Sequence, residues 1–550
     1  MKQHKLYILL IIAFATFYSC SDEQLDIENP NNLSADSFWA SEDDIQQGLI
    51  ATYAALQLDG LLGGAAASQL PVRSDTGRPN NWNANAIGLN KLAFNENSDI
   101  VKKRWRDCYI GVYRANQVLA NLDNIDLTTQ NRVQIEAETR FLRGFFYYSL
   151  YRGYNSGSVI IHTTVPESSE DFYKSPSPAK DVYNLILSDL EFAYNNLPEQ
   201  YENNQDKGRA TWGAAAAMLG KLHINEHNYG VAKDKFQEII TSNLYSLTAN
   251  IGDNFDEEHE MNSESIFEVA FSTELKTGTS NGATDGPLGS EATSRARTLA
   301  TTQGGGYRTI MPSYYMTMLF KNDVMDPNNP INANRTGTAN YSIRASQSIA
   351  IADDDNTTLY QRPSNLGGGY NNFEASYVKK FQNWMLFTES DQSISGINER
   401  AIRLADIKLL YAECLLMLNG SYDDALGQVN DIRQRAGVVL LNSADYERES
   451  LMEHIMWIER PLELMFEGHD TRWEDLTRWG KVQEQYDRLA SKRYVLIQKN
   501  LYEFDPNIHT DVTEETALKE FEDASQAYQQ GTHNYFPIPS TEQNSNPNLF

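Results

Sequence analysis

Residues 412–436 read AECLLMLNGSYDDALGQVNDIRQRA, and residues 217–240 read AMLGKLHINEHNYGVAKDKFQEII. Each stretch combines an apolar helical pattern, a short turn that contains Tyr, and a second, amphipathic helical pattern. Small residues stand where the two helices of a pair must approach closely. One such pair exposes an apolar face that it cannot bury alone, so neighbouring pairs are expected to stack into a solenoid.

The two stretches resemble tetratricopeptide repeats. Because they are scattered along the chain and not tandem, the sequence predicts a degenerate right-handed solenoid with long insertions. Apolar residues at helical spacing predict further helices. The expected helices cover residues 41–58, 99–124, 131–153, 179–196, 209–225, 229–242, 400–418, 422–435, 450–467 and 471–488. We therefore expect a mainly α protein with helix pairs as its scaffold.

The middle of the chain, residues 244–399, has a different character. Short strand-like runs such as residues 266–271 alternate with loops rich in Gly, Thr and Ser at residues 277–306 and 362–372. Long loops of this kind are commonly functional. The variable, loop-rich part at 244–399 thus lies between an N-terminal part at 41–243 and a C-terminal helical part at 400–550. We expect residues 60–98 and 272–384 to form a loop-rich ligand face.

The N-terminus has the pattern of a targeting segment. Lys2 and Lys5 precede an apolar run at residues 6–17 that is too short to span a bilayer, and Cys20 ends it after Ser19. This arrangement resembles the lipobox of bacterial lipoproteins, which implies a signal peptide at 1–19 and a lipidated tether at 20–40. The acidic residues after Cys20 resemble the export signal to the outer face of the outer membrane. The alternative is an ordinary secretory signal.

Composition excludes some partners and cofactors. The 550 residues contain 46 Lys and Arg against 74 Asp and Glu, a formal charge of −28 that repels nucleic acid. Apart from Cys20, only Cys108 and Cys414 are present, both in apolar helical stretches. We interpret them as buried free thiols and leave a disulfide between them open. No metal-ligand spacing was found, so no metal or cofactor is expected.

Six motifs in order make the chain recognisable. They are Trp105, Tyr109 and Asn116 at W-x₃-Y-x₆-N, EAETRFLRGFFYYSL at 136–150, RLADIKLLYAE at 403–413, NDIRQRAG at 430–437, ERPLELMFEGHDTRWEDLTRWG at 459–480, and the terminal FPIPSTEQNSNPNL. With the lipobox, they resemble the SusD/RagB family of nutrient-binding outer-membrane lipoproteins. The resemblance implies an anchored, outward-facing protein that passes its ligand to a SusC-like TonB-dependent transporter.

A catalytic interpretation of these motifs is disfavoured. Glu459 and Glu463 share one helix face at i, i+4 spacing, as a pair of glycosidase carboxylates would require. However, the Arg residues of the same motifs lower carboxyl pKa values, which is unsuitable for a general acid. We therefore expect buried ion pairs at this place and no enzyme.

Candidate ligand-binding residues come from the loops. Sugars are held by aromatic platforms and planar polar side chains, and the loop at residues 70–97 contains both kinds of residue. Trp82 lies among polar residues without helical period, which leaves a platform and a core position as alternatives. Trp384 lies in KKFQNWMLF, residues 379–387, where a strand is expected, and this pattern favours a core position for Trp384 over a ligand contact. The predicted ligand-binding residues are Arg78, Asn81, Trp82, Asn83, Tyr307, Tyr370 and Trp384.

The expected function is therefore capture of an oligosaccharide at the cell surface. The RagB side of the family suggests oligopeptide capture as an alternative. A third, remote alternative is a surface glycoside hydrolase.

Overall fold

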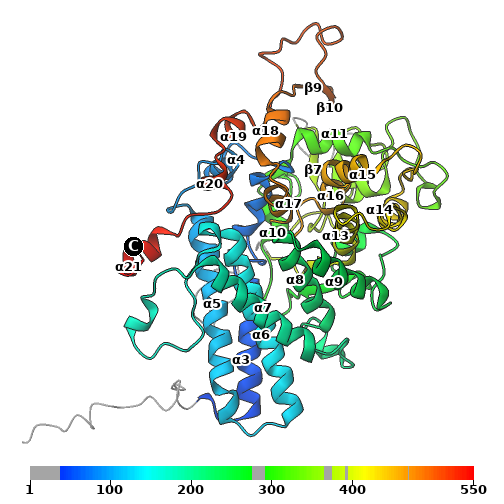
Figure 1. The fold of residues 1–550 in the computed structure, drawn as a ribbon. Coiled ribbons are helices and arrows are strands. Elements are labelled where there is room, and N and C mark those ends of the chain that lie inside the picture. Colours follow the sequence, from blue (N-terminus) through cyan, green and yellow to red (C-terminus); the bar gives the residue numbers. More distant parts are fainter. Residues whose placement is uncertain (1–37, 276–290, 364–373, 391–393, 469, 550) are drawn as a thin grey trace, which may run out of the picture.

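The computed structural model describes residues 38–275, 291–363, 374–390, 394–468 and 470–549. The predicted signal peptide, Cys20 and most of the predicted tether lie outside the described residues. Within them the fold is mainly α-helical with short strands (Figure 1), which confirms the predicted fold class. No helix in this part of the chain combines the length and the apolar character needed to cross a bilayer.

The helices come in three groups along the chain. The N-terminal group is α3 (Glu42–Ala54), α4 (Ala84–Asn90), α5 (Asp99–Asn121), α6 (Thr129–Gly153), α7 (Ala179–Asn196), α8 (Trp212–Asn225) and α9 (Tyr229–Thr241). The middle group is α10 (Arg295–Leu299), α11 (Tyr314–Asn322) and α12 (Ile343–Ser348). The C-terminal group is α13 (Leu404–Met417), α14 (Tyr422–Ala436), α15 (Arg448–His454), α16 (Arg460–Leu464), α17 (Thr471–Arg478), α18 (Val482–Ala490), α19 (Glu522–Ala527), α20 (Gln530–His533) and α21 (Ser540–Ser545).

The long helices stack into one continuous scaffold. From α5 to α9 each helix packs against the next, and α9 packs against α13, which packs against α14. Figure 1 shows this series running from the cyan helices at the bottom to the yellow helices on the right. The chain between α9 and α13 is therefore inserted between two neighbouring layers of the stack, as the scattered helix pairs predicted.

Local sequence explains the close packing within these pairs. Gly220 of α8 lies against the ring of Phe236 in α9, and a Cβ at this position would overlap that ring. At the second pair, the Ser421 side chain accepts the N–H of Asp424 and so caps α14. Gly437 ends the same helix with φ +73°, a left-handed conformation that favours glycine.

Two predicted helices are interrupted. The helix expected at 471–488 is two helices, α17 and α18, because Gly480 adopts φ +65° between them. The helix expected at 450–467 contains a π-helical turn at Ile455–Glu459. Pro461 has no N–H to donate to the carbonyl of Trp457, and the Tyr315 hydroxyl donates to that carbonyl instead, at 2.8 Å.

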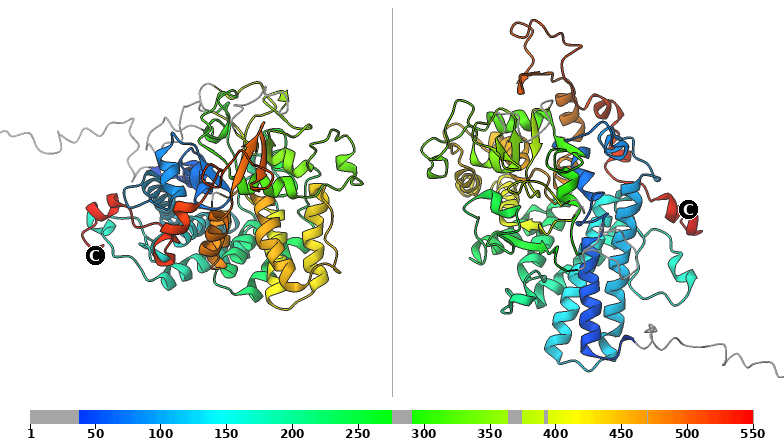
Figure 2. Two further views of the ribbon diagram at one scale, coloured as in Figure 1. Left: turned by 90° about the horizontal axis from the view of Figure 1, so that it is seen from above. Right: turned by 180° about the vertical axis from the view of Figure 1, so that it is seen from behind.

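The described strands form five antiparallel two-stranded pairs. They are β1 (Gly77–Pro79) with β3 (Ile310–Pro312), β2 (Ser265–Val269) with β8 (Glu399–Arg403), β4 (Ile349–Ile351) with β7 (Ser376–Val378), β5 (Thr358–Leu359) with β6 (Arg362–Pro363), and β9 (Tyr494–Ile497) with β10 (Asn500–Glu503). Since β8 leads directly into α13, the β2–β8 pair joins the inserted region to the stack. Figure 1 and Figure 2 show that β9 and β10 lie at the end of the molecule opposite the start of α3.

Both internal cysteines are buried free thiols, as the sequence predicted. Burial raises the pKa of the Cys108 thiol to about 12. The alternative of a disulfide between Cys108 and Cys414 is excluded by the structure.

Candidate functional site

A short strand pair brings two distant loops together. In the register of β1 and β3, Gly77 pairs with Pro312 and Pro79 with Ile310. The contact continues beyond the strands, because the Asn80 N–H donates to the carbonyl of Thr309 at 3.0 Å and its side-chain Nδ2 to the carbonyl of Arg308 at 2.9 Å. The residues that follow β1 therefore lie beside those that precede β3.

Trp82 and Tyr307 meet at this place and form what we call the aromatic ledge. The indole Nε1 of Trp82 donates to the carbonyl oxygen of Tyr307 at 3.2 Å. The two residues are 56% and 47% exposed, respectively. This exposure excludes the alternative that Trp82 belongs to the core. Two flat rings at the surface, fixed by a main-chain contact, suit a ligand that offers apolar C–H faces.

The loop that carries Tyr307 is fixed by close contacts. Gly306 lies so near Ala300 that a Cβ on it would overlap the Ala300 side chain and carbonyl. Gly305 has φ +82°, and the carbonyl of Gly304 accepts the N–H of Glu389 at 2.8 Å. The three consecutive glycines therefore let the backbone pack against its neighbours while Tyr307 projects outward.

Arg78 and Asn83 have structural partners. The Arg78 guanidinium pairs with Glu374 and lies 4.4 Å from the centre of the Tyr314 ring. The Asn83 side chain caps α4 by accepting the N–H of Ala86 at 2.9 Å. Asn81 is exposed next to Trp82. Of the three polar residues predicted near the ledge, Asn81 is thus the one whose side chain faces solvent.

Of the last two predicted ligand-binding residues, Trp384 lies within the described residues and Tyr370 does not. Trp384 is half-buried and packs beside the small apolar cluster that includes Tyr360 and Tyr377. The strand expected at residues 379–387 is wrong, because the strand β7 ends at Val378 and turns follow it. Buried Lys379 follows β7 directly, and its Nζ lies 3.4 Å from the Trp384 ring centre. Tyr370 lies outside the described residues.

An apolar surface near this region was not expected from the sequence. Met385, Leu386 and Phe387 are 46%, 57% and 58% exposed, and they precede the Glu389 that contacts Gly304. The run MLF in KKFQNWMLF is the available signal, but its apolar residues fit the pattern of a buried strand equally well. Apolar residues exposed in series commonly mark contact with a ligand or another protein.

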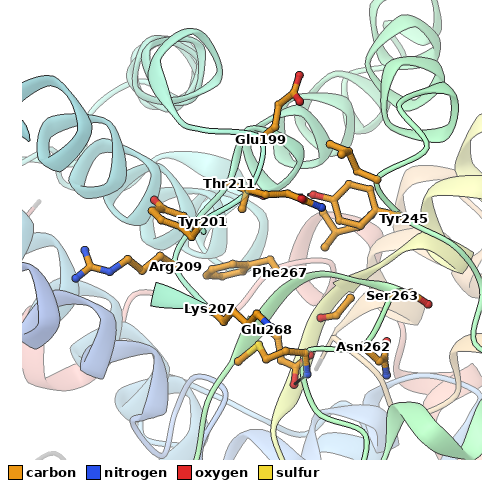
Figure 3. A pocket seen from close by; sticks show the side chains of 16 residues that line it. Glu199, Tyr201, Lys207, Arg209, Thr211, Tyr245, Asn262, Ser263, Phe267 and Glu268 are labelled. Carbon is orange, nitrogen blue, oxygen red and sulfur yellow. Dashed lines mark hydrogen bonds between the residues drawn. The ribbon is translucent and has the colours of Figure 1, made fainter. Parts of the chain in front are cut away.

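A polar cavity of about 370 Å³ lies between the loop after α7 and strand β2 (Figure 3). Tyr201, Arg209 and Glu268 are among its lining residues. Arg209 binds Glu138 at 3.3 Å, and Glu268 accepts the side-chain amide of Asn398 at 2.9 Å. Because Arg209 and Glu268 already bind other side chains, this cavity is not part of the candidate site.

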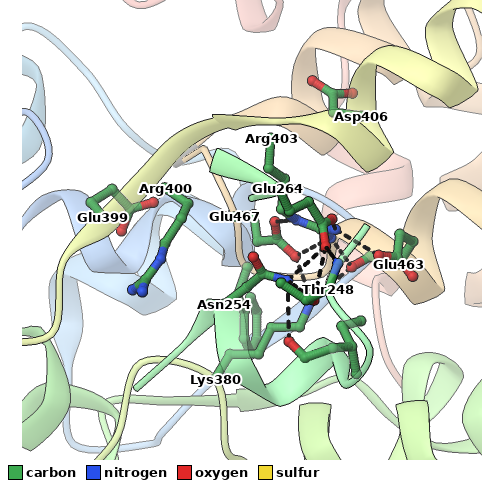
Figure 4. A network of polar contacts seen from close by, with 12 residues as sticks. Thr248, Asn254, Glu264, Lys380, Glu399, Arg400, Arg403, Asp406, Glu463 and Glu467 are labelled. Atoms are coloured by element: carbon green, nitrogen blue, oxygen red, sulfur yellow. Dashed lines mark hydrogen bonds and ion pairs between the residues drawn. The ribbon is translucent and has the colours of Figure 1, made fainter. Parts of the chain in front are cut away.

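The predicted ion pairs around Glu459 and Glu463 are present. Glu463 accepts from Arg403 at 2.7 Å, and Arg403 also binds Glu264 at 2.6 Å (Figure 4). Glu459 accepts from Arg433 at 2.8 Å. We call these five residues the buried ion-pair cluster; its carboxylates are fully buried.

The electrostatics of the cluster are unsuited to acid catalysis. Burial opposes ionisation of Glu463, but the guanidinium groups of Arg435, Arg403 and Arg344 outweigh it and hold its pKa below the usual value. Burial is likewise outweighed at Glu459, where Arg344 and Arg433 keep the pKa well below that of a free Glu. A general acid needs the opposite shift, so we interpret the cluster as a structural feature.

One group of possible metal ligands occurs among the described residues, namely Asp253, Asp256 and His259. The His259 Nδ1 lies 3.0 Å from both carboxylate oxygens of Asp256. One of those oxygens also accepts the N–H groups of Glu258 and His259. These hydrogen bonds are those of a local turn, and they account for the closeness of the three side chains.

Comparison with known proteins identifies the family. The family model described as "SusD family" matches residues 263–550, more than half of the chain. The chain belongs to the SusD family. A second SusD-like model, described as "Starch-binding associating with outer membrane", matches residues 23–224. The resemblance drawn from the six sequence motifs is thereby confirmed.

Relatives of known sequence and structure agree with this assignment. The SusD-like protein P25 of Formosa agariphila is 26% identical over 86% of this chain and 90% of its own length. A SusD superfamily protein from Bacteroides vulgatus has the same fold, with a TM-score of 0.75 and 24% identity over 93% of this chain and 99% of its own. A laminarin-binding SusD-like protein also shares the fold, with a TM-score of 0.69 and 23% identity over 93% and 99% of the two chains.

Proposed function

We propose that this chain is a cell-surface lipoprotein that binds an oligosaccharide on the aromatic ledge. The observation that carries the proposal is the pair of exposed rings, Trp82 and Tyr307, held by their hydrogen bond. A sugar ring stacks its C–H face on such a surface and presents its hydroxyl groups to neighbouring polar side chains, of which Asn81 is one. The laminarin-binding relative supports the ligand class.

Charge favours a neutral glycan over an anionic one. The whole chain carries a formal charge of −28, which repels polyanions. At the ledge, Arg78 pairs with Glu374, and Arg308 lies 3.8 Å from the same carboxylate. These two guanidinium groups thus face a carboxylate of the protein itself, and a third, Arg297, lies 5.0 Å from the centre of the Tyr307 ring.

Affinity electrophoresis tests the ligand class. The mature chain is run in gels that contain laminarin, xylan, mannan or polygalacturonate, beside Trp82→Ala. Retardation by a neutral polysaccharide that is weaker in the variant than in the wild type supports the proposal. Binding to a peptide library with no retardation in any gel would favour oligopeptide capture instead.

The anchor and the transport partner are further parts of the proposal. The lipobox at Cys20 supports lipidation, and the family description supports association with the outer membrane. A SusC-like TonB-dependent transporter is the proposed recipient of the ligand. Cys20→Ala is expected to move the protein from the membrane to the soluble fraction, and affinity purification of the wild-type lipoprotein is expected to recover the transporter.

A binding role without catalysis completes the proposal. It is supported by the family and by the depressed pKa values of Glu459 and Glu463. Release of reducing sugar from a bound polysaccharide by the purified protein would contradict it.

A further inference from the structure

A cleft on the helical scaffold, away from the ledge, has the features of a second binding site. It encloses about 580 Å³, within the range of small-molecule sites. Its walls come from α5, from the loop at residues 160–173 and from α21. This loop lies to the left of α5 in Figure 1, close to the C-terminal helix. None of its lining residues belongs to the ledge.

Aromatic rings follow one another along the cleft. The ring centres of Trp105 and Tyr109 are 4.9 Å apart, those of Tyr109 and His162 5.9 Å, and those of His162 and Phe172 6.5 Å. Phe172 and a further lining residue, Tyr113, are 49% and 40% exposed. Exposed aromatic side chains gathered in one place commonly mark a binding surface.

The loop wall of the cleft is fixed before any ligand arrives. The Tyr109 hydroxyl donates to the carbonyl of Ile160 at 2.8 Å, and the Asn116 side chain donates to the carbonyl of His162 at 2.8 Å. On the other side, the side-chain amides of Asn546 and Asn548 donate to the carbonyls of Lys174 and Tyr173 at 2.9 and 2.6 Å. Such preorganisation reduces the entropy cost of binding.

Polar groups among the rings indicate the chemistry of the ligand. Residues with hydroxyl, amide or carboxylate groups make up much of the lining: Tyr113, Asn116, Gln117, Thr164, Tyr173, Thr541, Glu542 and Ser545. A purely apolar ligand would cover these groups without hydrogen bonds, which costs free energy. A sugar offers both an apolar C–H face for the rings and hydroxyls for the polar groups.

The charges of the cleft favour a neutral ligand. Burial lowers the pKa of His162 to about 4, so this imidazole is uncharged at neutral pH. The Arg106 guanidinium pairs with Asp107 at 2.8 Å, and the two further charged lining residues, Arg114 and Glu542, are of opposite sign. We propose that the cleft between α5, the 160–173 loop and α21 is a second carbohydrate-binding site, which takes one or two neutral sugar rings.

The test uses variants of exposed rings, because these leave the fold intact. Tyr113→Ala and Phe172→Ala are combined, with and without Trp82→Ala, in the mature chain. Tyr502→Ala is a matched control, since Tyr502 is also exposed, at 41%, and lies on β10. Saturation-transfer difference NMR is recorded with laminaritriose, cellotriose, xylotriose and mannotriose, and melting temperatures confirm folding.

The expected result is that Trp82→Ala retains saturation transfer to at least one trisaccharide. Adding Tyr113→Ala and Phe172→Ala is expected to weaken this remaining binding at least about tenfold, whereas adding Tyr502→Ala leaves it unchanged. Loss of all transfer in Trp82→Ala alone, unchanged transfer in the triple variant, or no transfer from any probe overturns the second site. If binding depends on Tyr113 and Phe172 but not on Trp82, the ledge proposal fails and the second site stands.

Discussion

The Trp82 indole N–H donates to the main-chain carbonyl of Tyr307 at 3.2 Å, although 225 residues of sequence separate them. This contact uses the edge of the indole and leaves its face open. It also ties the position of one ring to the backbone of the other. A substitution at either residue is therefore expected to affect the same surface.

Trp82→Ala is expected to weaken oligosaccharide binding without unfolding the protein. The lost ring contact is expected to cost about 2 kcal/mol or more, as at interface hot spots, which is at least about tenfold in Kd. Because Trp82 is exposed, the free energy of unfolding is expected to change by about 0.5 kcal/mol at most. Calorimetric titration and thermal melting of the same variant check both numbers. Unchanged affinity would remove Trp82 from the site.

Gly306→Ala is expected to damage the ledge indirectly. Its new Cβ would overlap Ala300, so the loop that carries Tyr307 must shift. We expect weaker ligand binding with the Trp82 and Tyr307 rings both still present. Gly230→Ala is the control, because a Cβ there meets no atom within 4 Å. Equal ligand affinity in the two variants would show that the position of the loop that carries Tyr307 does not affect binding.

The helical scaffold could be predicted because its signals are local. Apolar spacing located the pairs around Gly220 and Ser421, and the cap of α14 follows from the Ser421 side chain itself. The separation of α17 from α18 at Gly480 was harder to predict, since a single glycine inside a helical pattern is often tolerated. Its φ of +65° is a property of the folded chain.

The candidate site was only partly predictable, because several of its residues contact residues that are distant in sequence. Arg and Asn side chains are suited to bind sugar hydroxyls, which is why Arg78 and Asn83 were predicted. In the structure, however, Arg78 pairs with Glu374, 296 residues away, and Asn83 caps α4. The pairing of β1 with β3, which aligns Trp82 with Tyr307, involves strands of three residues. Such strands are too short for an alternating pattern to be recognised.

Glu463→Gln is expected to destabilise the protein strongly. The variant leaves Arg403 and Arg435 with one less buried negative charge, and breaking a buried ion pair typically costs about 3–5 kcal/mol. Glu484→Gln is the control, because Glu484 pairs with Lys481 at the surface, where such a pair contributes about 1 kcal/mol or less. Urea unfolding measures both. A Glu463→Gln protein as stable as the control would contradict the structural role of the cluster.

Glu520 is expected to make stability depend on pH in the weakly acidic range. Burial raises its pKa to about 7, even though Arg78 and the N–H groups of Tyr314 and Tyr315 favour the carboxylate. Between pH of about 4.5 and 7 the unfolded chain has lost this proton and the folded chain still holds it. The folded state therefore binds more protons, and its stability falls as the pH rises through this window.

Comparison of the wild type with Glu520→Gln isolates this group. The variant cannot ionise, so the free energy of unfolding of the wild type relative to the variant is expected to fall by about 3 kcal/mol from pH 4.5 to 7, at 1.36 kcal/mol per pKa unit. Burial also raises the pKa of Glu260 to about 7, and Glu260→Gln is expected to remove a separate decline in the same window. Urea unfolding at a series of pH values measures each difference. A difference that rises with pH between 4.5 and 7 would mean that the folded state favours the Glu520 carboxylate, and that Arg78 outweighs burial at this position.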